Sequence, residues 1–255
     1  MYVRKLTKEP ICIIYSKTFQ KEYNILMTSA NSPANHVIIY SHGFGVRKED
    51  RGLFTAIARA LPGATSVMFN YNPINESSNT LTAKPLPEQA RKLRKVINAT
   101  RAEYPGAVID IVGHSQGCVA VALLKPRDIR KIIMLTPPDD VNEALVARQL
   151  GARTETTIDT TTRTRLQRAD GSTTVIHPEY WQGLAGIDPV KLYNKLARFT
   201  ALRIMKARHD EVLGDVQFEG IDPSVSLVTL DGDHNFSDEE ARKRVLYILQ
   251  KELAL

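Results

Sequence analysis

The stretch Gly113-His114-Ser115-Gln116-Gly117 decides how this chain is expected to fold. It matches the pattern G-x-S-x-G and follows the short apolar run Ala107–Val112, which is typical of a buried strand. A helical pattern containing Val119–Leu124 comes directly after it. In such a strand–turn–helix the serine backbone is strained, and side chains at positions 113 and 117 would collide with neighbouring elements. The stretch therefore predicts that Ser115 presents its hydroxyl at the carboxyl edge of a sheet.

Strand and helix patterns alternate on both sides of this turn. Further strands are expected at Ile11–Tyr15, Tyr23–Met27, Val37–Tyr40, Thr65–Phe69, Ile132–Leu135, Ala201–Met205 and Val225–Leu230, and the first two are expected to form a hairpin. Helices are expected over Arg51–Leu61, from Pro87 to Tyr104, and at the C-terminus, where Ser237 and Glu240 form a capping-box pattern. This alternation predicts an α/β fold, a mostly parallel sheet flanked by helices.

One segment, residues 139–198, breaks the alternation. It contains a Thr-rich run and the turn sequence Asp170-Gly171, flanked by Thr162–Leu166 and Thr173–Ile176, which predicts a hairpin. We expect an inserted cap of a hairpin plus helices at 139–198, within a core formed by residues 1–138 and 199–255. A disordered loop is the alternative, but four large apolar side chains there need burial: Tyr180, Trp181, Leu184 and Ile187. The hairpin arginines Arg163, Arg165 and Arg168 are expected on a solvated face, with attraction of acidic groups as the alternative.

A serine hydroxyl is a weak nucleophile, so Ser115 needs a base and a group that orients the base. After a turn of this kind the acid and then the histidine follow the serine along the chain. His234 lies between the last predicted strand and the last helix, where a loop at the sheet edge reaches Ser115. Asp210 follows the strand Ala201–Met205 and is the predicted acid, with Glu211 as the neighbour most easily confused with it. We therefore predict the triad Ser115, Asp210 and His234.

A tetrahedral intermediate on Ser115 needs backbone donors for its oxyanion. One is expected from the N–H of Gln116, the residue after the nucleophile, and the other from the N–H of Phe44 in the loop His42-Gly43-Phe44-Gly45. The Phe44 side chain is also a candidate for an acyl-pocket wall. Tyr180 and Trp181 are further candidates for substrate binding, with packing inside the cap as the alternative.

These motifs together resemble those of α/β-hydrolase serine esterases of the feruloyl/cinnamoyl esterase type. The resemblance rests on four motifs in the same order: His42-Gly43-Phe44, the stretch 113–117, His209-Asp210, and the run from Asp233 to Asp238. It covers roughly residues 10–135 and 200–255, and Cys118 stands where that group often has another glycine. The resemblance implies an α/β-hydrolase fold with an inserted cap, and hydrolysis of a small-molecule ester through an acyl-enzyme, without metal or cofactor.

The composition of the chain argues against several other classes of function. The 255-residue chain has a net charge of +6, without a dense Lys/Arg tract or a basic face with interleaved aromatics, so no nucleic-acid partner is expected. Its two cysteines, Cys12 and Cys118, form neither a disulfide framework nor a metal-ligand spacing. With no signal-peptide pattern and no apolar run long enough to span a bilayer, we expect a cytoplasmic protein without membrane contact, as a monomer or homodimer.

Two alternatives to a carboxylesterase stay open at this point. A thioesterase or an acylaminoacyl-type peptidase would use the same triad, because the cap rather than the triad selects the substrate. A non-catalytic binding protein could also use this scaffold. Against that reading, every catalytic position carries the residue type that hydrolysis requires.

Overall fold

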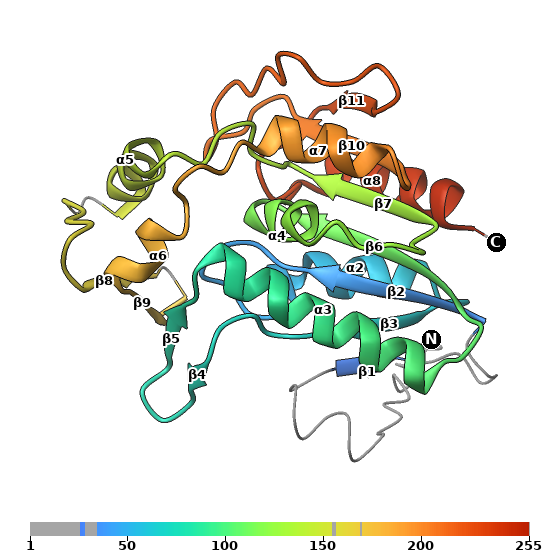
Figure 1. Cartoon of the computed structure of the whole chain (residues 1–255), viewed down its shortest axis with the longest axis horizontal. Coiled ribbons are helices and arrows are strands. Elements are labelled where there is room, and N and C mark those ends of the chain that lie inside the picture. Colours follow the sequence, from blue (N-terminus) through green and yellow to red (C-terminus); the bar gives the residue numbers. More distant parts are fainter. Residues whose placement is uncertain (1–25, 29–34, 155–156, 169, 255) are drawn as a thin grey trace, which may run out of the picture.

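The computed structural model describes residues 26–28, 35–154, 157–168 and 170–254, and its main element is a seven-stranded sheet (Figure 1). The strand order is β1-β3-β2-β6-β7-β10-β11. The bounds are β1 Leu26–Thr28, β2 His36–Ser41, β3 Thr65–Met68, β6 Val108–His114, β7 Lys131–Leu135, β10 Ala201–Ala207 and β11 Ser226–Leu230. Only β1 runs antiparallel to its neighbour, so the predicted mostly parallel sheet is confirmed. The expected strand Ile11–Tyr15, and with it the expected hairpin, lies outside the described residues.

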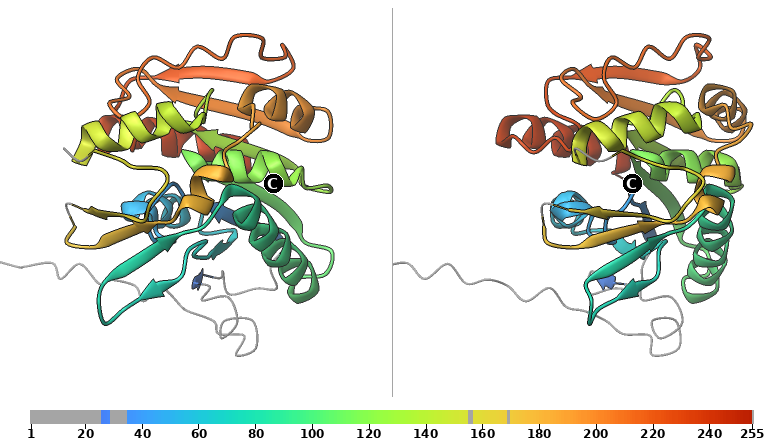
Figure 2. Two further views of the ribbon diagram at one scale, coloured as in Figure 1. Left: turned by 60° about the vertical axis from the view of Figure 1, so that its left-hand side comes forward. Right: turned by 90° about the vertical axis from the view of Figure 1, so that its left-hand side faces the viewer.

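Helices cover both faces of this sheet (Figures 1 and 2). One face carries α3 (Leu86–Glu103), α4 (Gln116–Leu124) and α7 (Pro189–Ala197), and the other carries α2 (Leu53–Ala60) and α8 (Glu239–Leu253). The central strand β2 is buried along its whole length, and β6 is buried from its second residue on, because each is covered on both sides. Among the described helices, none has the length and apolar character that crossing a bilayer requires.

A second, four-stranded sheet lies beyond the carboxyl ends of the parallel strands. Its order is β4-β5-β9-β8, with β4 Ile74–Asn75, β5 Thr80–Ala83, β8 Thr164–Gln167 and β9 Thr173–Ile176. The predicted hairpin is confirmed as the antiparallel pair β8–β9, and Gly171 takes the positive φ of 78° that its turn needs. The helices α5 (Glu143–Thr154) and α6 (Pro178–Gln182) complete this region.

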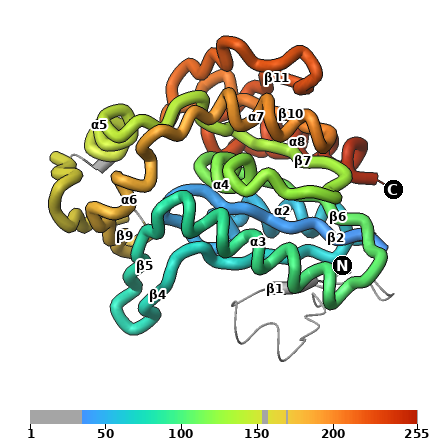
Figure 3. The backbone as a smooth tube through the Cα atoms, viewed as in Figure 1, coloured from blue at the N-terminus to red at the C-terminus, as the bar shows by residue number. Residues whose placement is uncertain are grey.

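The region beyond the sheet edge is built from two stretches of chain. Strand β5, from the predicted core, pairs in parallel with β9 of the predicted cap. Helix α7, within the predicted cap range, packs against α4 and β10 on the large sheet. We use "cap segment" below for residues 139–188, which run from the end of β7 to the start of α7, as the tube in Figure 3 shows. The division into core 1–138, 199–255 and cap 139–198 stays a prediction.

The turn between β6 and α4 shows why its glycines are needed. Ser115 has φ 51° and ψ −129°, a conformation that side-chain-bearing residues rarely adopt. A Cβ on Gly117 would lie 2.1 Å from the carbonyl oxygen of Ser41, and one on Gly113 would lie 3.2 Å from Cys118 Sγ. The first turn of α4 is thus pressed against the end of β2, and only glycine allows that approach.

The predicted capping box of the C-terminal helix is displaced by one residue. The N-cap of α8 is Asp238, whose carboxylate accepts from the backbone N–H groups of Glu240 and Ala241. Ser237 instead donates its hydroxyl to Asp233. A carboxylate caps as well as a hydroxyl does, and the two candidates are adjacent, so the pattern alone could not separate them.

The close approach at Gly117 gives a stability prediction. Gly117→Ala should lower the free energy of unfolding by about 3 kcal/mol or more, because backbone carbonyls cannot move aside as a flexible side chain can. Gly63→Ala is the matched control, since a Cβ there meets nothing within 4 Å, and its effect should stay within about 0.5 kcal/mol. Urea unfolding followed by circular dichroism measures both, and equal stability of the two variants would contradict the prediction.

Candidate active site

The structure brings the three predicted triad residues into one hydrogen-bonded chain. His234 Nε2 lies 3.0 Å from Ser115 Oγ, and His234 Nδ1 lies 2.8 Å from Asp210 Oδ2. Ser115 follows β6, Asp210 follows β10 and His234 follows β11, so three parallel strands deliver them to one edge. His234 is 4% exposed and Asp210 8% exposed. The geometry matches a nucleophile, a base and an orienting acid.

The neighbouring acid, Glu211, takes a different position. Its Oε2 accepts from the backbone N–H of His234 at 3.0 Å, so it holds the loop and does not contact the ring nitrogens. Asp210 Oδ1 accepts from the backbone N–H groups of Val212 and Leu213, at 3.0 and 2.7 Å. These two bonds fix the carboxylate and leave Oδ2 for the histidine.

Burial sets the protonation state of His234. Desolvation is the largest influence and lowers its pKa below the ordinary value of 6.5, while the hydrogen bond from Nδ1 to Asp210 partly offsets this. A positive charge on His114 adds to the lowering. The imidazole is therefore neutral at neutral pH, with its proton on Nδ1 toward Asp210 and its Nε2 lone pair toward the serine hydroxyl. That is the form a general base requires.

The predicted oxyanion donors lie around Ser115 on two sides. A Cβ on Gly43 would lie 3.2 Å from Ser115 Cβ, so the loop that carries Phe44 packs directly against the serine. Gln116 is the first residue of α4, where backbone N–H groups lack an intrahelical acceptor. Among the described residues, no oxygen accepts from the N–H of Phe44 or of Gln116. Both donors are thus available to a bound group.

Arg168 supports the Phe44 loop from the cap segment, which the sequence did not predict. Its Nη2 donates to the carbonyl oxygens of Phe44 and Gly45, at 3.2 and 3.3 Å, and its Nε donates to Thr174 Oγ1 at 3.0 Å. Arg163 and Arg165 are exposed as expected, but Arg168 is only 9% exposed. The expectation of a solvated arginine is wrong here, because the hairpin end folds back onto the loop after β2.

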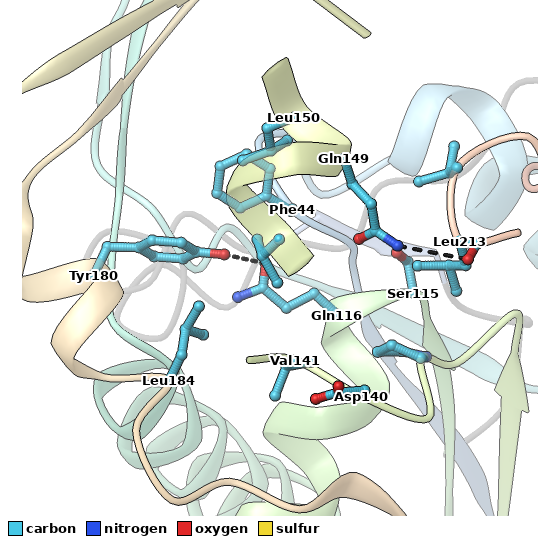
Figure 4. A pocket seen from close by; sticks show the side chains of 13 residues that line it. Phe44, Ser115, Gln116, Asp140, Val141, Gln149, Leu150, Tyr180, Leu184 and Leu213 are labelled. Atoms are coloured by element: carbon cyan, nitrogen blue, oxygen red, sulfur yellow. Dashed lines mark hydrogen bonds between the residues drawn. The ribbon is translucent and has the colours of Figure 1, made fainter. Parts of the chain in front are cut away.

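A pocket has Ser115 in its wall (Figure 4). Phe44 and Tyr180 both line it, with ring centroids 5.2 Å apart, and the Tyr180 hydroxyl donates to Gln116 Oε1 at 3.2 Å. Trp181 does not line it. Consecutive residues of a helix point in directions about 100° apart, so Trp181 packs into the core and contacts Tyr180 edge-on.

Most of the pocket wall was not predicted from the sequence. The additional lining residues are Pro138, Asp140, Val141, Val146, Gln149, Leu150, Leu184, Val212 and Leu213. Three of them, Val146, Gln149 and Leu150, have the spacing of one helix face. That spacing was the pattern from which α5 could have been predicted to line the pocket. Gln149 Nε2 reaches Leu213 O at 3.5 Å, which links α5 to the loop after β10 beside Ser115 (Figure 4).

Within the described part of the chain, no three His, Cys, Asp or Glu side chains are grouped so that they could hold a metal ion. Cys118, one turn after Ser115, is buried, and burial raises the pKa of its thiol well above the ordinary value. A thiol in that state is a poor nucleophile. Ser115 is thus the nucleophile candidate at this turn.

Comparisons with known structures agree on the fold. The chain is similar to the esterase domain of a Rhodothermus marinus protein, with a TM-score of 0.64 and 19% identity over 89% of this chain and 90% of that one. It is also similar to Est1E from Butyrivibrio proteoclasticus with bound ferulic acid, with a TM-score of 0.67 and 17% identity over 90% and 93%. An alpha/beta serine hydrolase homologue from Coxiella burnetii has a TM-score of 0.59 and 16% identity over 90% and 91%. No family model and no curated protein matches the sequence. The predicted α/β-hydrolase fold is confirmed.

The protonation state of His234 gives a testable pH dependence. Reaction of Ser115 with a fluorophosphonate should be fast at neutral pH and fall with a midpoint below pH 6.5, because the lowered pKa keeps His234 unprotonated down to that range. Labelling rates from pH 4.5 to 9 measure the midpoint, with circular dichroism as a control for folding at each pH. A midpoint at or above pH 6.5 would contradict the described environment.

Proposed function

We propose that this protein is a serine esterase that cleaves carboxylic esters with a short-chain or aromatic acyl group, through an acyl-enzyme on Ser115. The observation that carries the proposal is the hydrogen-bonded chain from Ser115 through His234 to Asp210 at the wall of a largely apolar pocket. In this role Ser115 is the nucleophile, His234 the general base and acid, and Asp210 the residue that orients the imidazole.

The first half-reaction forms a bond from Ser115 Oγ to the ester carbonyl carbon while His234 Nε2 takes the hydroxyl proton. Negative charge moves to the carbonyl oxygen, where the N–H groups of Phe44 and Gln116 stabilise it. The positive end of α4 favours the same charge, since the helix begins at Gln116. The intermediate then collapses, His234 gives its proton to the alcohol oxygen, and the alcohol leaves. Water repeats the sequence on the acyl-enzyme and releases the acid.

The lining of the pocket favours binding of an uncharged acyl group of limited size. Its aromatic and aliphatic walls, with Phe44 and Tyr180 at one side, favour burial of an apolar or aromatic group. Asp140 is among the lining residues and disfavours a carboxylate on the acyl chain. The structural similarity to Est1E, which has been seen with ferulic acid bound, supports testing an aromatic acyl group here as well.

Replacement of the nucleophile tests the proposal directly. Ser115→Ala should abolish hydrolysis of p-nitrophenyl acetate, butyrate and octanoate and of methyl ferulate, while Ser224→Ala, at an exposed serine, should keep full activity. The preferred ester then reports the size of the acyl pocket. Turnover that survives Ser115→Ala after clean purification would refute the proposal. Fluorophosphonate labelling of Ser115 without ester turnover would redirect it to thioesters and acyl peptides.

The role of Asp210 is tested by comparing substitutions at Asp210 and at its neighbour Glu211. Asp210→Asn should lower kcat by on the order of 10³–10⁴, because the amide no longer holds the proton of His234 on Nδ1. Glu211→Gln should have a much smaller effect, since its contact is with the backbone N–H and an amide oxygen can still accept that bond. Steady-state kinetics on the preferred ester compare the two, and equal losses would show that the acid is wrongly assigned.

A further inference from the structure

A second buried histidine–carboxylate pair lies directly behind the proposed triad. His114 Nδ1 is 2.7 Å from Asp50 Oδ2, and each residue is only 2% exposed. His114 immediately precedes Ser115, and its ring centroid lies 5.0 Å from that of His234. None of the triad roles uses either residue. A charged pair removed from water is costly unless it is well bonded, so its presence at this position calls for a reason.

The hydrogen bonds determine where the protons of this pair lie. His114 Nε2 is 3.0 Å from the carbonyl oxygen of His234, and a carbonyl only accepts, so Nε2 carries a proton. Burial alone would lower the pKa of His114, but the charge and hydrogen bond of Asp50 outweigh it and raise that pKa. Burial opposes the charge on Asp50 too, yet His114 brings the Asp50 pKa below its ordinary value. Both ring nitrogens of His114 are therefore protonated, opposite an ionised Asp50.

The pair joins two loops on which the proposed reaction depends. Asp50 Oδ2 also accepts from the backbone N–H of Gly43, at 3.1 Å, one residue before the predicted oxyanion donor Phe44. At the other end, the His234 carbonyl oxygen accepts from His114 Nε2 and from Thr136 Oγ1, each at 3.0 Å. The chain of contacts thus runs from the oxyanion loop through Asp50 and His114 to the backbone of the base.

The backbone of Asp50 is itself held in an uncommon conformation. Asp50 has a φ of 45°, and Arg51 and Gly52 follow with 53° and 86°. Such left-handed conformations cost free energy in residues with side chains, and they persist where the surrounding structure enforces them. The carboxylate held by this backbone is buried and bonded to Gly43 and His114.

We propose that Asp50 and His114 are positioning residues that hold the oxyanion loop and the loop of His234 at a fixed spacing across Ser115. This proposal rests on the proposed esterase function.

The charge on His114 has a second effect: it disfavours protonation of His234 and so keeps the base active at lower pH. The other charged groups that face His234 are Asp210 and Glu211, and both favour its protonation. Asp50 also interacts electrostatically with His42, in the loop after β2, and with Arg242, in α8.

The isosteric variant Asp50→Asn separates charge from shape. The amide oxygen of an asparagine can still accept from the Gly43 N–H, but without the carboxylate charge the pKa of His114 falls and its ring keeps a single proton. We expect kcat/KM on the preferred ester to fall about 10- to 100-fold, because small displacements of the groups that position the reaction cost up to about 100-fold. The acid limb of the kcat/KM profile should also move to higher pH, because the nearby positive charge that disfavours protonation of His234 is gone. A lower rate with an unmoved limb, or an unchanged rate, would overturn the proposal.

His36 offers a matched control for His114. His36 Nε2 lies 2.7 Å from Asp110 Oδ2, in a buried pair at the start of β2, the end of the strand that lies away from Ser115. Asp110 also accepts from Arg130 Nε, at 3.0 Å. His36→Gln should cost stability without changing kcat/KM or the acid limb, whereas His114→Gln should lower kcat/KM. Equal kinetics for the two variants would show that the pair at Asp50 is structural only, and so overturn the proposal.

Two readouts keep this test independent of the proposed function. In the wild-type protein, histidine-selective ¹⁵N NMR should place the titration of His114 above the ordinary midpoint of pH 6.5, with both nitrogens protonated at that pH, and a singly protonated ring there would overturn the proposal even if the variants fail to fold. In Asp50→Asn, the NMR titration of His234 should shift to higher pH whether or not the protein hydrolyses esters. Failure of the esterase function itself would instead appear as wild-type protein without Ser115-dependent turnover.

Discussion

The approach of the first turn of α4 to the end of β2 is the constraint on which the rest of the site depends. At Gly117 the two backbones are so close that a Cβ would lie 2.1 Å from the carbonyl oxygen of Ser41. This contact places Ser115 against Gly43, so the loop of Phe44 and the proposed nucleophile are neighbours in space. It also holds Ser115 in its strained conformation, since the turn has no room to relax. The neighbouring parallel strands then carry Asp210 and His234 to the same edge, where short loops suffice to reach the serine.

A feature could be predicted from the sequence where neighbouring residues mark it, and not where it depends on contacts between distant parts of the chain. The parallel sheet and the positions of Ser115, Asp210 and His234 were accessible because strand ends and tight turns leave local signals. The partner of His114 was not accessible, because Asp50 lies 64 positions away and nothing in either neighbourhood marks the pair. The burial of Arg168 was missed for the same reason, since it depends on how the hairpin folds onto the loop of Phe44. Trp181 was only a candidate for the pocket because its residue type gives no direction for its side chain, and the structure shows the alternative, packing into the core.

The groups around His234 have opposing effects on its pKa, and the net result keeps the ring neutral. Asp210 and Glu211 both favour a proton on His234, and burial together with His114 opposes them. The two acids are given separate tasks by geometry alone: Oδ2 of Asp210 meets the ring, and Oε2 of Glu211 meets the backbone. Single hydrogen bonds of this kind contribute about 1 kcal/mol of net stability each, and more where a charge takes part. Their value here lies in excluding other orientations of the imidazole.

The parallel pairing of β5 with β9 has a consequence for how this architecture changes in evolution and in the laboratory. One strand of that pair precedes Ser115 in the chain and the other follows it, so the four-stranded sheet is built from two separate stretches of chain. Transplanting residues 139–188 alone into a relative would leave one edge of β9 without its hydrogen-bonding neighbour. A chimera that keeps this pairing has to exchange residues 73–83 at the same time, because the two strands come from separate stretches of the gene.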